Sequence, residues 1–514
     1  MDHMEKALVP EGAAKPVQIS RKVYETIPHG RLLLAGTLAL CLLAVNAAEW
    51  PWGAGNTVTV FAWYALLLPA MDRETLTRRR ESRVLLVVNL LLAASFALTS
   101  NHWFRVWNFL ALMALVPLQA ASLSAGDLLP WWRPAMFGER LGLLCRGAFC
   151  HLGAAPAALS AGREKRSVSL TVVLGAAAAL ALVSVLLPIL ASADALFAAA
   201  TRGLTEFIRL HFARGLWKLF WALVLTPFLF GLLYCLRRTP AKAKVHTLYT
   251  VDSILFTIVL GALDALYLLF LAVQSAGLFG GPEYVESLGV SYAEWARSGF
   301  FQMVGVTIVN LAAVMAALTF SQREGRTWRA LRVLAAALTG ESLILLASAA
   351  WRMTLYVSAY GLSFKRLMTY WGMVMTALFL LSALEKIRKP DRSFCRRTLP
   401  LALAGWLAIN CVPVDYLVAK NQVDRCLAGQ CETVDLQYLL YDLSYDTLSQ
   451  LERLDGKQVY TVYAGYAQGR LTRRLADLLE DRRAEARADC AGWRGWNLSA
   501  CLAAGSGALS RQQP

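Results

Sequence analysis

The chain has 514 residues, of which 57% are hydrophobic and only 17% are charged. An ordinary soluble domain carries about a quarter charged residues, so water cannot be the solvent for most of this chain. The net charge of +16 raises the question of a nucleic-acid ligand. Residues 413–514, however, hold 12 Lys and Arg against 13 Asp and Glu. The basic excess therefore belongs to the apolar part, which argues against nucleic acid as a partner.

Apolar stretches that are long enough to cross a lipid bilayer recur along the chain. A helix rises about 1.5 Å per residue, so about 20 apolar residues cross the roughly 30 Å of hydrocarbon. Backbone groups in lipid must be satisfied within the segment, which requires helices. We predict an all-α, polytopic transmembrane bundle with about eleven spans. The predicted spans lie near 32–48, 56–71, 84–100, 104–121, 168–190, 216–235, 250–275, 300–320, 330–351, 367–384 and 399–413.

Two amphipathic stretches, 137–159 and 193–212, are predicted to lie in the membrane interface. With the N-terminus in the cytoplasm, the loops on that side carry 30 of the 39 Lys and Arg that precede residue 413. This is the positive-inside bias that orients membrane proteins. We therefore predict a multi-pass protein of the bacterial inner membrane. It would have a cytoplasmic segment 1–30, a transmembrane domain 31–412 and an extracytoplasmic C-terminal domain 413–514.

The C-terminal domain is predicted to be small and mostly helical. Leucines near helical spacing indicate one helix over 434–454, and a highly charged stretch indicates another over 471–488. Disulfide bonds are compatible with the predicted compartment. The candidates are Cys426 and Cys431, which flank a tight turn, and Cys490 and Cys501, which bracket a Trp-rich stretch; the sequence does not fix their pairing.

Two acids are predicted at bilayer depth. Asp264 lies near the middle of the stretch 250–275, and Glu341 lies near the middle of the stretch 330–351. A charged side chain at this depth costs about 2.5 to 3.5 kcal/mol on insertion scales, so the presence of each acid needs a structural or functional explanation. One interpretation is a proton or cation site of a transporter. The other is that Asn310, Tyr267 or serines of neighbouring helices satisfy the acids and hold the bundle together.

A basic and aromatic group is predicted near the outer interface. Arg352, Tyr356 and Tyr360 follow one another at a spacing of four residues and project from one side of a helix end. Arginine offers paired donors that match phosphate geometry, so the group is a candidate site for an anionic headgroup. The alternative is a belt that anchors helix ends at the headgroups. The candidate ligand-binding residues are Tyr292, Arg297, Arg352, Tyr356, Tyr360 and Arg366, with Gln274 and Lys365 nearby.

Signatures of soluble enzymes are missing from the sequence. There is no phosphate loop, no His-Glu-x-x-His and no Gly-x-Ser-x-Gly, and the six histidines share no spacing. We predict no catalytic residues, no metal site, no cofactor and no enzymatic activity. A membrane enzyme that acts on a lipid-linked substrate stays open as an alternative. Its acids would be Glu283, Glu286 and Glu294, or acids of the C-terminal domain.

Two motifs resemble a known family. These are Tyr292-Ala-x-x-Ala-Arg297-x-Gly-Phe-Phe301 and Arg352-Met-x-x-Tyr356-x-x-Ala-Tyr360-Gly-Leu-x-x-x-Arg366, with support from stretches up to about residue 500. They resemble the bacterial membrane family called domain of unknown function forty-one seventy-three. The second Arg and the Thr of that pattern are replaced here by Ser298 and Ser363. The resemblance implies a polytopic bacterial membrane protein and no reaction.

The leading functional hypothesis is an inner-membrane protein that binds an anionic lipid or an envelope partner at its outer face. Its evidence is the convergence of Arg297, Arg352 and the nearby tyrosines. The second hypothesis is a secondary transporter that uses Asp264 and Glu341, and the third is the membrane enzyme. The lipid bilayer is the one partner common to all three.

Overall fold

The computed structural model describes residues 29–71, 79–124, 128–160, 213–238, 250–274, 300–431, 433–463 and 470–510, with single residues between 175 and 201 and between 280 and 289. The described chain is almost entirely helical, which confirms the all-α class. The helices up to residue 410 are α1 (Gly30–Ala47), α2 (Ala54–Ala70), α4 (Arg80–Leu98), α5 (His102–Ala121), α6 (Met136–Cys150), α7 (Ala154–Ser160), α10 (Ala213–Arg238), α11 (Ser253–Gln274), α14 (Phe300–Phe320), α15 (Gly325–Tyr360), α16 (Phe364–Arg388) and α17 (Cys395–Asn410).

Among the described residues, seven helices are long and apolar enough to cross a membrane: α1, α4, α5, α10, α11, α15 and α16. Helix α17 and α18 (Val414–Leu427), bent by 52°, add an eighth if they form one span. Helix α2 and the part Val304–Phe320 of α14 are shorter apolar helices. A polytopic membrane protein is thereby confirmed, while the number eleven stays a prediction. The predicted span 168–190 and the stretch 193–212 lie largely outside the described residues.

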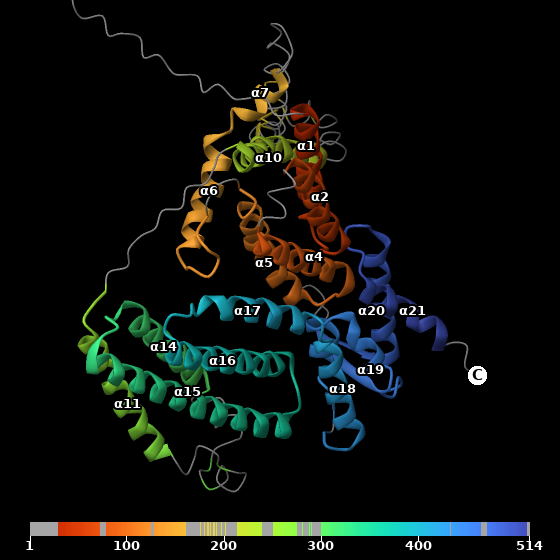
Figure 1. Ribbon diagram of the computed structural model, residues 1–514. Helices are drawn as coiled ribbons and strands as arrows, with labels where there is room; N and C mark the ends of the chain where they lie inside the picture. Colours follow the sequence, from red (N-terminus) through yellow and green to blue (C-terminus); the bar gives the residue numbers. More distant parts are fainter. Residues whose placement is uncertain are drawn as a thin grey trace, which may run out of the picture.

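The membrane helices form two packed groups (Figure 1). Helices α1, α2, α5, α6 and α10 share one buried apolar cluster that includes Leu40, Leu67 and Leu233. Helices α11, α14, α15 and α16 share others, which include Leu260, Leu331 and Leu380. Phe96 of α4 and Leu112 of α5 pack with residues of α17, so that α4, α5 and α17 join the two groups.

The ends of the helices sort consistently into two faces. On one face, the connections after α1, α4 and α15 all bind the C-terminal region: the backbone N–H of Ala54 donates to the carbonyl of Trp496, and Ser100 hydrogen-bonds Ser499. On the opposite face, the start of α4 meets α6, where Arg140 pairs with Glu81 at 2.7 Å. In the described part of the chain, α4 therefore begins at one face and ends at the other.

Aromatic rings gather at the face that binds the C-terminal region. Trp103, Phe104, Phe364 and Trp406 lie with ring centroids between 5.3 and 6.0 Å apart. Tryptophan is enriched at the level of the lipid headgroups, because its ring is apolar and its N–H is polar. Phe104 and Phe364 are buried in the apolar core of the C-terminal region, so this cluster also joins that region to the helix ends.

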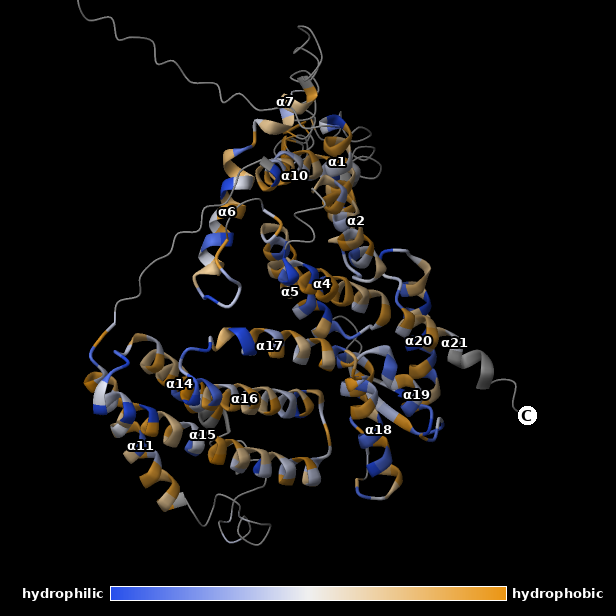
Figure 2. Ribbon diagram, in the orientation of Figure 1, coloured by the Kyte–Doolittle hydropathy of each residue, from blue (hydrophilic) through white to orange (hydrophobic). Residues whose placement is uncertain are grey.

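The C-terminal region has its own secondary structure: α18, the π-helical turn η2 (Tyr438–Asp442), the 3₁₀ turn η3 (Tyr445–Thr447), α19 (Leu448–Leu451), β1 (Val459–Tyr463), β2 (Arg470–Arg474), α20 (Leu475–Ala491) and α21 (Leu498–Ser510). Strands β1 and β2 form an antiparallel hairpin in which Val459 is opposite Arg474. Helix α20 is largely hydrophilic, in contrast to the membrane helices (Figure 2). We call residues 414–510 the cap, because they cover one end of the bundle (Figure 1).

The structure corrects both predicted helices of the cap. The stretch 434–454 is not one helix, because the chain is extended at Leu443 and Ser444 between η2 and η3. Its leucines are nevertheless buried as the periodicity indicates, including Leu439 and Leu451. The second helix begins at Leu475 and not at residue 471, because 470–474 pair as a strand with 459–463. Tertiary pairing overrides local propensity here.

Candidate functional site

The two deep acids come together inside the second helix group. Asp264 lies on α11, whose other mid-helix side chains, such as Ile258 and Leu268, are largely exposed. The buried stripe of α11 contains Leu260 and Asp264 and packs against α15. Glu341 lies on the facing surface of α15, within electrostatic range of Asp264. Both acids are almost completely buried, with 4% and 6% of their surface exposed.

Helix α14 adds a third polar side chain to this pair. The amide of Asn310, itself 1% exposed, donates to the hydroxyl of Ser342 at 3.0 Å. Ser342 follows Glu341 on α15, and its hydroxyl donates to the carbonyl of Leu338 at 2.7 Å. This bond uses one N–H of the Asn310 amide, and the amide oxygen is buried and receives no hydrogen bond from the described residues. We call Asp264, Glu341 and Asn310 the carboxylate cluster.

Most acceptor oxygens of the carboxylate cluster are buried without a hydrogen bond. Both oxygens of Asp264, Oε2 of Glu341 and Oδ1 of Asn310 are buried and receive no hydrogen bond from the described residues. Within the described chain, neither acid belongs to an ion pair with Lys or Arg. Oxygen-only ligands suit a proton or a hard cation. Asn310 donates to Ser342 and not to an acid, while the hydroxyl of Tyr267 on α11 interacts with Asn310 and lies within electrostatic range of Glu341. Satisfaction of the acids by Asn310, Tyr267 or serines stays a prediction.

A transition-metal centre is not what these residues resemble. No three His, Cys, Asp or Glu side chains gather at one place within the part of the chain that the structure describes. Two carboxylates and one amide oxygen include none of the nitrogen or sulfur ligands that transition metals prefer, so this set of ligands suits a proton or a hard cation.

The predicted outer-interface group is assembled only in part. The rings of Tyr356 and Tyr360 lie edge to face at 5.3 Å, and the guanidinium of Arg366 lies 4.0 Å from the centroid of Tyr356. Arg352 lies one turn before Tyr356 on α15 and is half-buried, and Lys365 is exposed. Tyr292 and Arg297 lie outside the described residues, as do the side chain of Gln274 and the acids Glu283, Glu286 and Glu294.

Two arginines cap the end of α15 in this region. Arg366 donates to the carbonyls of Tyr360 and Gly361, and Arg425 donates to those of Ser358 and Ala359 at 2.7 and 2.9 Å. The last carbonyls of a helix have no partner within the helix, and its dipole favours cations there. Gly361 ends the helix with a φ of 74°, and a Cβ at this position would lie 2.8 Å from Gln422. Much of the guanidinium capacity is therefore used structurally.

A pocket of about 380 Å³ lies beside these arginines, between the α15–α16 turn and the cap. Its lining includes Arg366, Arg425, Tyr360 and Tyr438. The hydroxyl of Tyr438 accepts a hydrogen bond from the N–H of Phe364 at 2.9 Å. Arg425 and Tyr438 belong to the cap, and nothing in the sequence pattern places them next to α15. We call this space the outer pocket.

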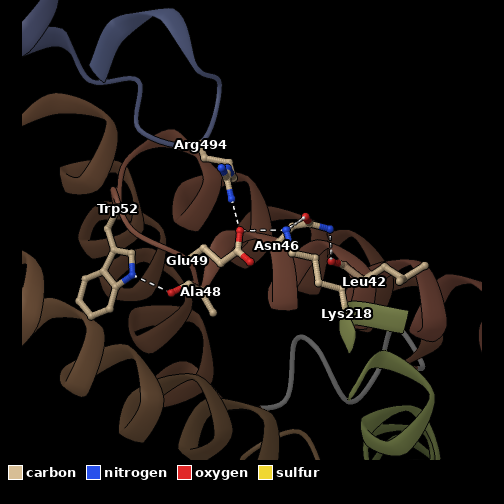
Figure 3. Close-up of polar contacts among 7 residues, drawn as sticks. All are labelled: Leu42, Asn46, Ala48, Glu49, Trp52, Lys218 and Arg494. Atoms are coloured by element: carbon tan, nitrogen blue, oxygen red, sulfur yellow. Dashed lines mark hydrogen bonds and ion pairs between the residues drawn. The ribbon is translucent and has the colours of Figure 1, made fainter. Parts of the chain in front are cut away.

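The cap is held to the membrane helices by buried and by exposed polar contacts. Asp415, 2% exposed, accepts from the amide of Asn101 at 2.7 Å and from the N–H of Ser444 at 3.0 Å. At the rim, Glu49 after α1 binds Lys218 of α10 at 2.8 Å and also Arg494 of the cap (Figure 3). The backbones approach closely here, since a Cβ at Gly53 would lie 2.5 Å from the carbonyl of Gly495.

The contacts of Glu49 predict a pH dependence of cap docking. The hydrogen bond from Lys218, reinforced by Arg494, lowers the pKa of Glu49 below its ordinary value of 4.5. A carboxyl whose pKa is lowered in the docked state stabilises that state fully at pH values above its ordinary pKa. This stabilisation is lost as the pH falls through the lowered pKa. We expect Glu49→Gln to raise cap proteolysis about twofold at pH 7, the scale of an exposed pair, and progressively less as the pH falls through the lowered pKa. An effect that does not change with pH would contradict the assignment.

The four cysteines of the cap lie as two neighbouring pairs of free thiols, Cys426 with Cys431 and Cys490 with Cys501. Burial, and then the hydrogen bond with Cys501, raises the pKa of Cys490 to about 12. A thiol with so high a pKa is little ionised and oxidises slowly without a catalyst. The disulfide bonds stay a prediction.

The neighbouring thiols give a test of compartment. In protein isolated from intact cells we expect both pairs to resist alkylation until reduced, while the exposed Cys145 of α6 alkylates at once. Disulfides persist outside the cytoplasm and not within it. Mass spectrometry of differentially alkylated peptides makes the measurement. Immediate alkylation of all four thiols would contradict an oxidising location of the cap.

Comparison with known proteins adds one finding. The sequence model of a protein family described as domain of unknown function (DUF4153) matches residues 86–454. No curated protein and no solved structure matches the chain. The match covers the carboxylate cluster, the outer pocket and the first part of the cap. It confirms an uncharacterised domain family, but it does not confirm the narrower resemblance to the forty-one seventy-three family or its two motifs.

Proposed function

Because this chain belongs to the family described as domain of unknown function (DUF4153), and its bundle encloses two acids, we propose that it is a membrane transporter coupled to a proton or a monovalent cation. Asp264 and Glu341 bind the coupling ion, and Asn310 supplies a neutral oxygen ligand. The observation that carries the proposal is the set of buried oxygens without a donor on three different helices. Two buried acids without a cationic partner need a proton or a cation for neutrality.

The arrangement of the helices supports such a role. Asp264 lies on α11, whose surface is mostly exposed beside the acid, so a small displacement of one helix opens the cluster. Ion sites of transporters lie near the middle of the bilayer, between helices that move relative to one another. Both acids lie near the middle of their helices, as the sequence predicts.

The test is gradient-driven flux in proteoliposomes. The protein is reconstituted into liposomes that contain a pH-sensitive dye. We expect proton movement across the liposome membrane when a pH gradient, a sodium gradient or a potassium gradient is applied. Asp264→Asn and Glu341→Gln should each lower the rate at least tenfold, because the amides bind no proton and carry no charge. Asp252→Asn is the matched control, since Asp252 precedes α11, is exposed and caps the N–H of Ile254. Flux no faster than that of empty liposomes under all three gradients would refute the proposal.

A second candidate function uses the outer pocket, where Arg366 and Arg425 lie beside Tyr360. This pocket favours an anionic lipid headgroup or an anionic group of an envelope partner. The cap then faces the extracytoplasmic side of a bacterial inner membrane, with the N-terminus in the cytoplasm. Native mass spectrometry tests this function, and Arg425→Ala should lower the retention of an added anionic lipid. Arg453→Ala is the control and should not lower it, because Arg453 forms an exposed ion pair with Asp424 of the cap.

A further inference from the structure

The face opposite the cap has a cavity of about 590 Å³, at the turn between α16 and α17. Four cationic side chains line it, together with two acids and the ring of Trp132. The cationic residues are Lys386, Arg392, Arg396 and Arg397, and the acids are Glu385 and Asp391. The hydroxyl of Ser393 donates to the carbonyl of Trp132 at 2.7 Å, so the connection between α5 and α6 closes one side of the cavity. We call it the basic cavity.

Both acids of the basic cavity already have arginine partners. Glu385 binds Arg392 at 2.7 Å and also binds Arg397, while Asp391 binds Arg323 of the α14–α15 turn at 3.0 Å. Among the described residues, Lys386 and Arg396 have no acidic partner: Lys386 donates to the carbonyl of Pro390, and Arg396 lies over the ring of Trp132 at 5.3 Å. The basic cavity therefore keeps an excess of positive charge.

A second pocket, of about 380 Å³, adjoins the basic cavity and shares Glu385 and Arg397 with it. It is lined by Leu381 and Leu384 together with Arg388 and Lys389. Leu381 is 52% exposed, and Val374, two turns earlier on the same side of α16, is 58% exposed. In a membrane this side of α16 faces acyl chains. A cationic cavity thus opens beside an apolar surface at the end of one helix.

We propose that this juxtaposition is a binding site for one anionic phospholipid. The phosphate lies in the basic cavity with Lys386 and Arg396, and an acyl chain lies along Leu381 and Val374. A positive-inside belt explains basic residues at this face, but it requires neither a cavity nor an adjoining apolar pocket. Basic pockets between membrane helices are the usual sites for anionic headgroups. A free phosphate ion would bind the same cationic side chains, but it would make no contact with the apolar surface at Leu381.

The experiment is native mass spectrometry of the full chain in detergent, with dioleoyl phosphatidylglycerol or dioleoyl phosphatidylcholine added at equal concentration. We expect clear preference for phosphatidylglycerol. Lys386→Ala/Arg396→Ala should weaken its retention roughly thirtyfold, as two lost surface cations imply. The charge-preserving Lys386→Arg/Arg396→Lys should retain it. Arg326→Ala/Arg329→Ala is the matched control, because both arginines are exposed on the same face, at the start of α15, and line neither pocket.

Three results would overturn this proposal. One is equal retention of the two lipids by the wild-type protein, which needs no variant to fold. Another is equal weakening in the control pair, which would show a general effect of surface charge. The third is displacement of phosphatidylglycerol by millimolar inorganic phosphate, which would show a site for a soluble anion. None of these results bears on flux through the carboxylate cluster.

Discussion

Replacing the deep acids by apolar residues is expected to stabilise this protein. Asp264→Val and Glu341→Leu substitute side chains of similar volume for two buried carboxyls, and three of the four carboxyl oxygens receive no hydrogen bond from the described residues. Replacing buried ion pairs by apolar residues of similar volume is often neutral or stabilising by about 1 to 4 kcal/mol, and acids without a cationic partner have still less Coulomb energy to lose. Both variants should therefore melt at higher temperature in detergent, and both should lose gradient-driven flux. The measurement pairs differential scanning fluorimetry with proteoliposome flux.

This experiment separates the two interpretations of the acids. If Asp264 and Glu341 held the helices together, their removal would lower the melting temperature, as loss of a satisfied polar contact does. Asn89→Leu provides that comparison, since the amide of Asn89 is buried between helices and donates to Tyr64 at 2.7 Å. We expect it to cost about 0.6 kcal/mol or somewhat more, the average for hydrogen bonds between membrane helices. Destabilisation of the acid variants to that extent would make the carboxylate cluster structural.

Loss of Asp415 is expected to detach the cap from the bundle. One oxygen of Asp415 accepts hydrogen bonds from the amide of Asn101 and from the N–H of Ser444. Asn101 in turn caps the start of α5, because its side chain accepts from the N–H of Phe104. In Asp415→Ala the amide of Asn101 and the N–H of Ser444 would have no acceptor, at about 1 to 3 kcal/mol each. The bond from Asn101 joins the bundle to the cap, and the bond from Ser444 holds the cap segment around it in place. We expect faster limited proteolysis of the cap at unchanged membrane insertion. The exposed pair of Asp424 with Arg453 on the same helix gives the control Asp424→Ala, which should change little.

An unchanged rate of cap proteolysis in Asp415→Ala would show that other contacts hold the cap. Those contacts are known: Ser100 with Ser499, Leu362 with Asn421, and Phe364 with Tyr438. The variant Asp415→Asn keeps an acceptor oxygen and should lie between the wild type and the alanine variant. The order of the three proteins, more than any single value, tests the role of this buried carboxyl.

The linear order of residues by itself determined the membrane helices, their apolar character and the mid-helix positions of the two acids. Uninterrupted apolar runs specify helices in lipid because no other local structure satisfies the backbone. The positions of Asp264 and Glu341 within two of these apolar runs likewise placed both acids near the middle of a helix. Burial of the cap leucines followed from their spacing, although the chain between them bends at Ser444.

Only the tertiary structure decided which polar groups meet. That Asp264 faces Glu341, that Asn310 turns its amide to Ser342, and that Arg425 caps α15 depend on which helix faces pack together. The β-hairpin and the basic cavity likewise join residues that are distant in sequence or separated by turns. The sequence of an apolar helix does not show which neighbouring helix it packs against, because lipid and the protein interior are similarly apolar. Polar contacts between helices are therefore consequences of packing.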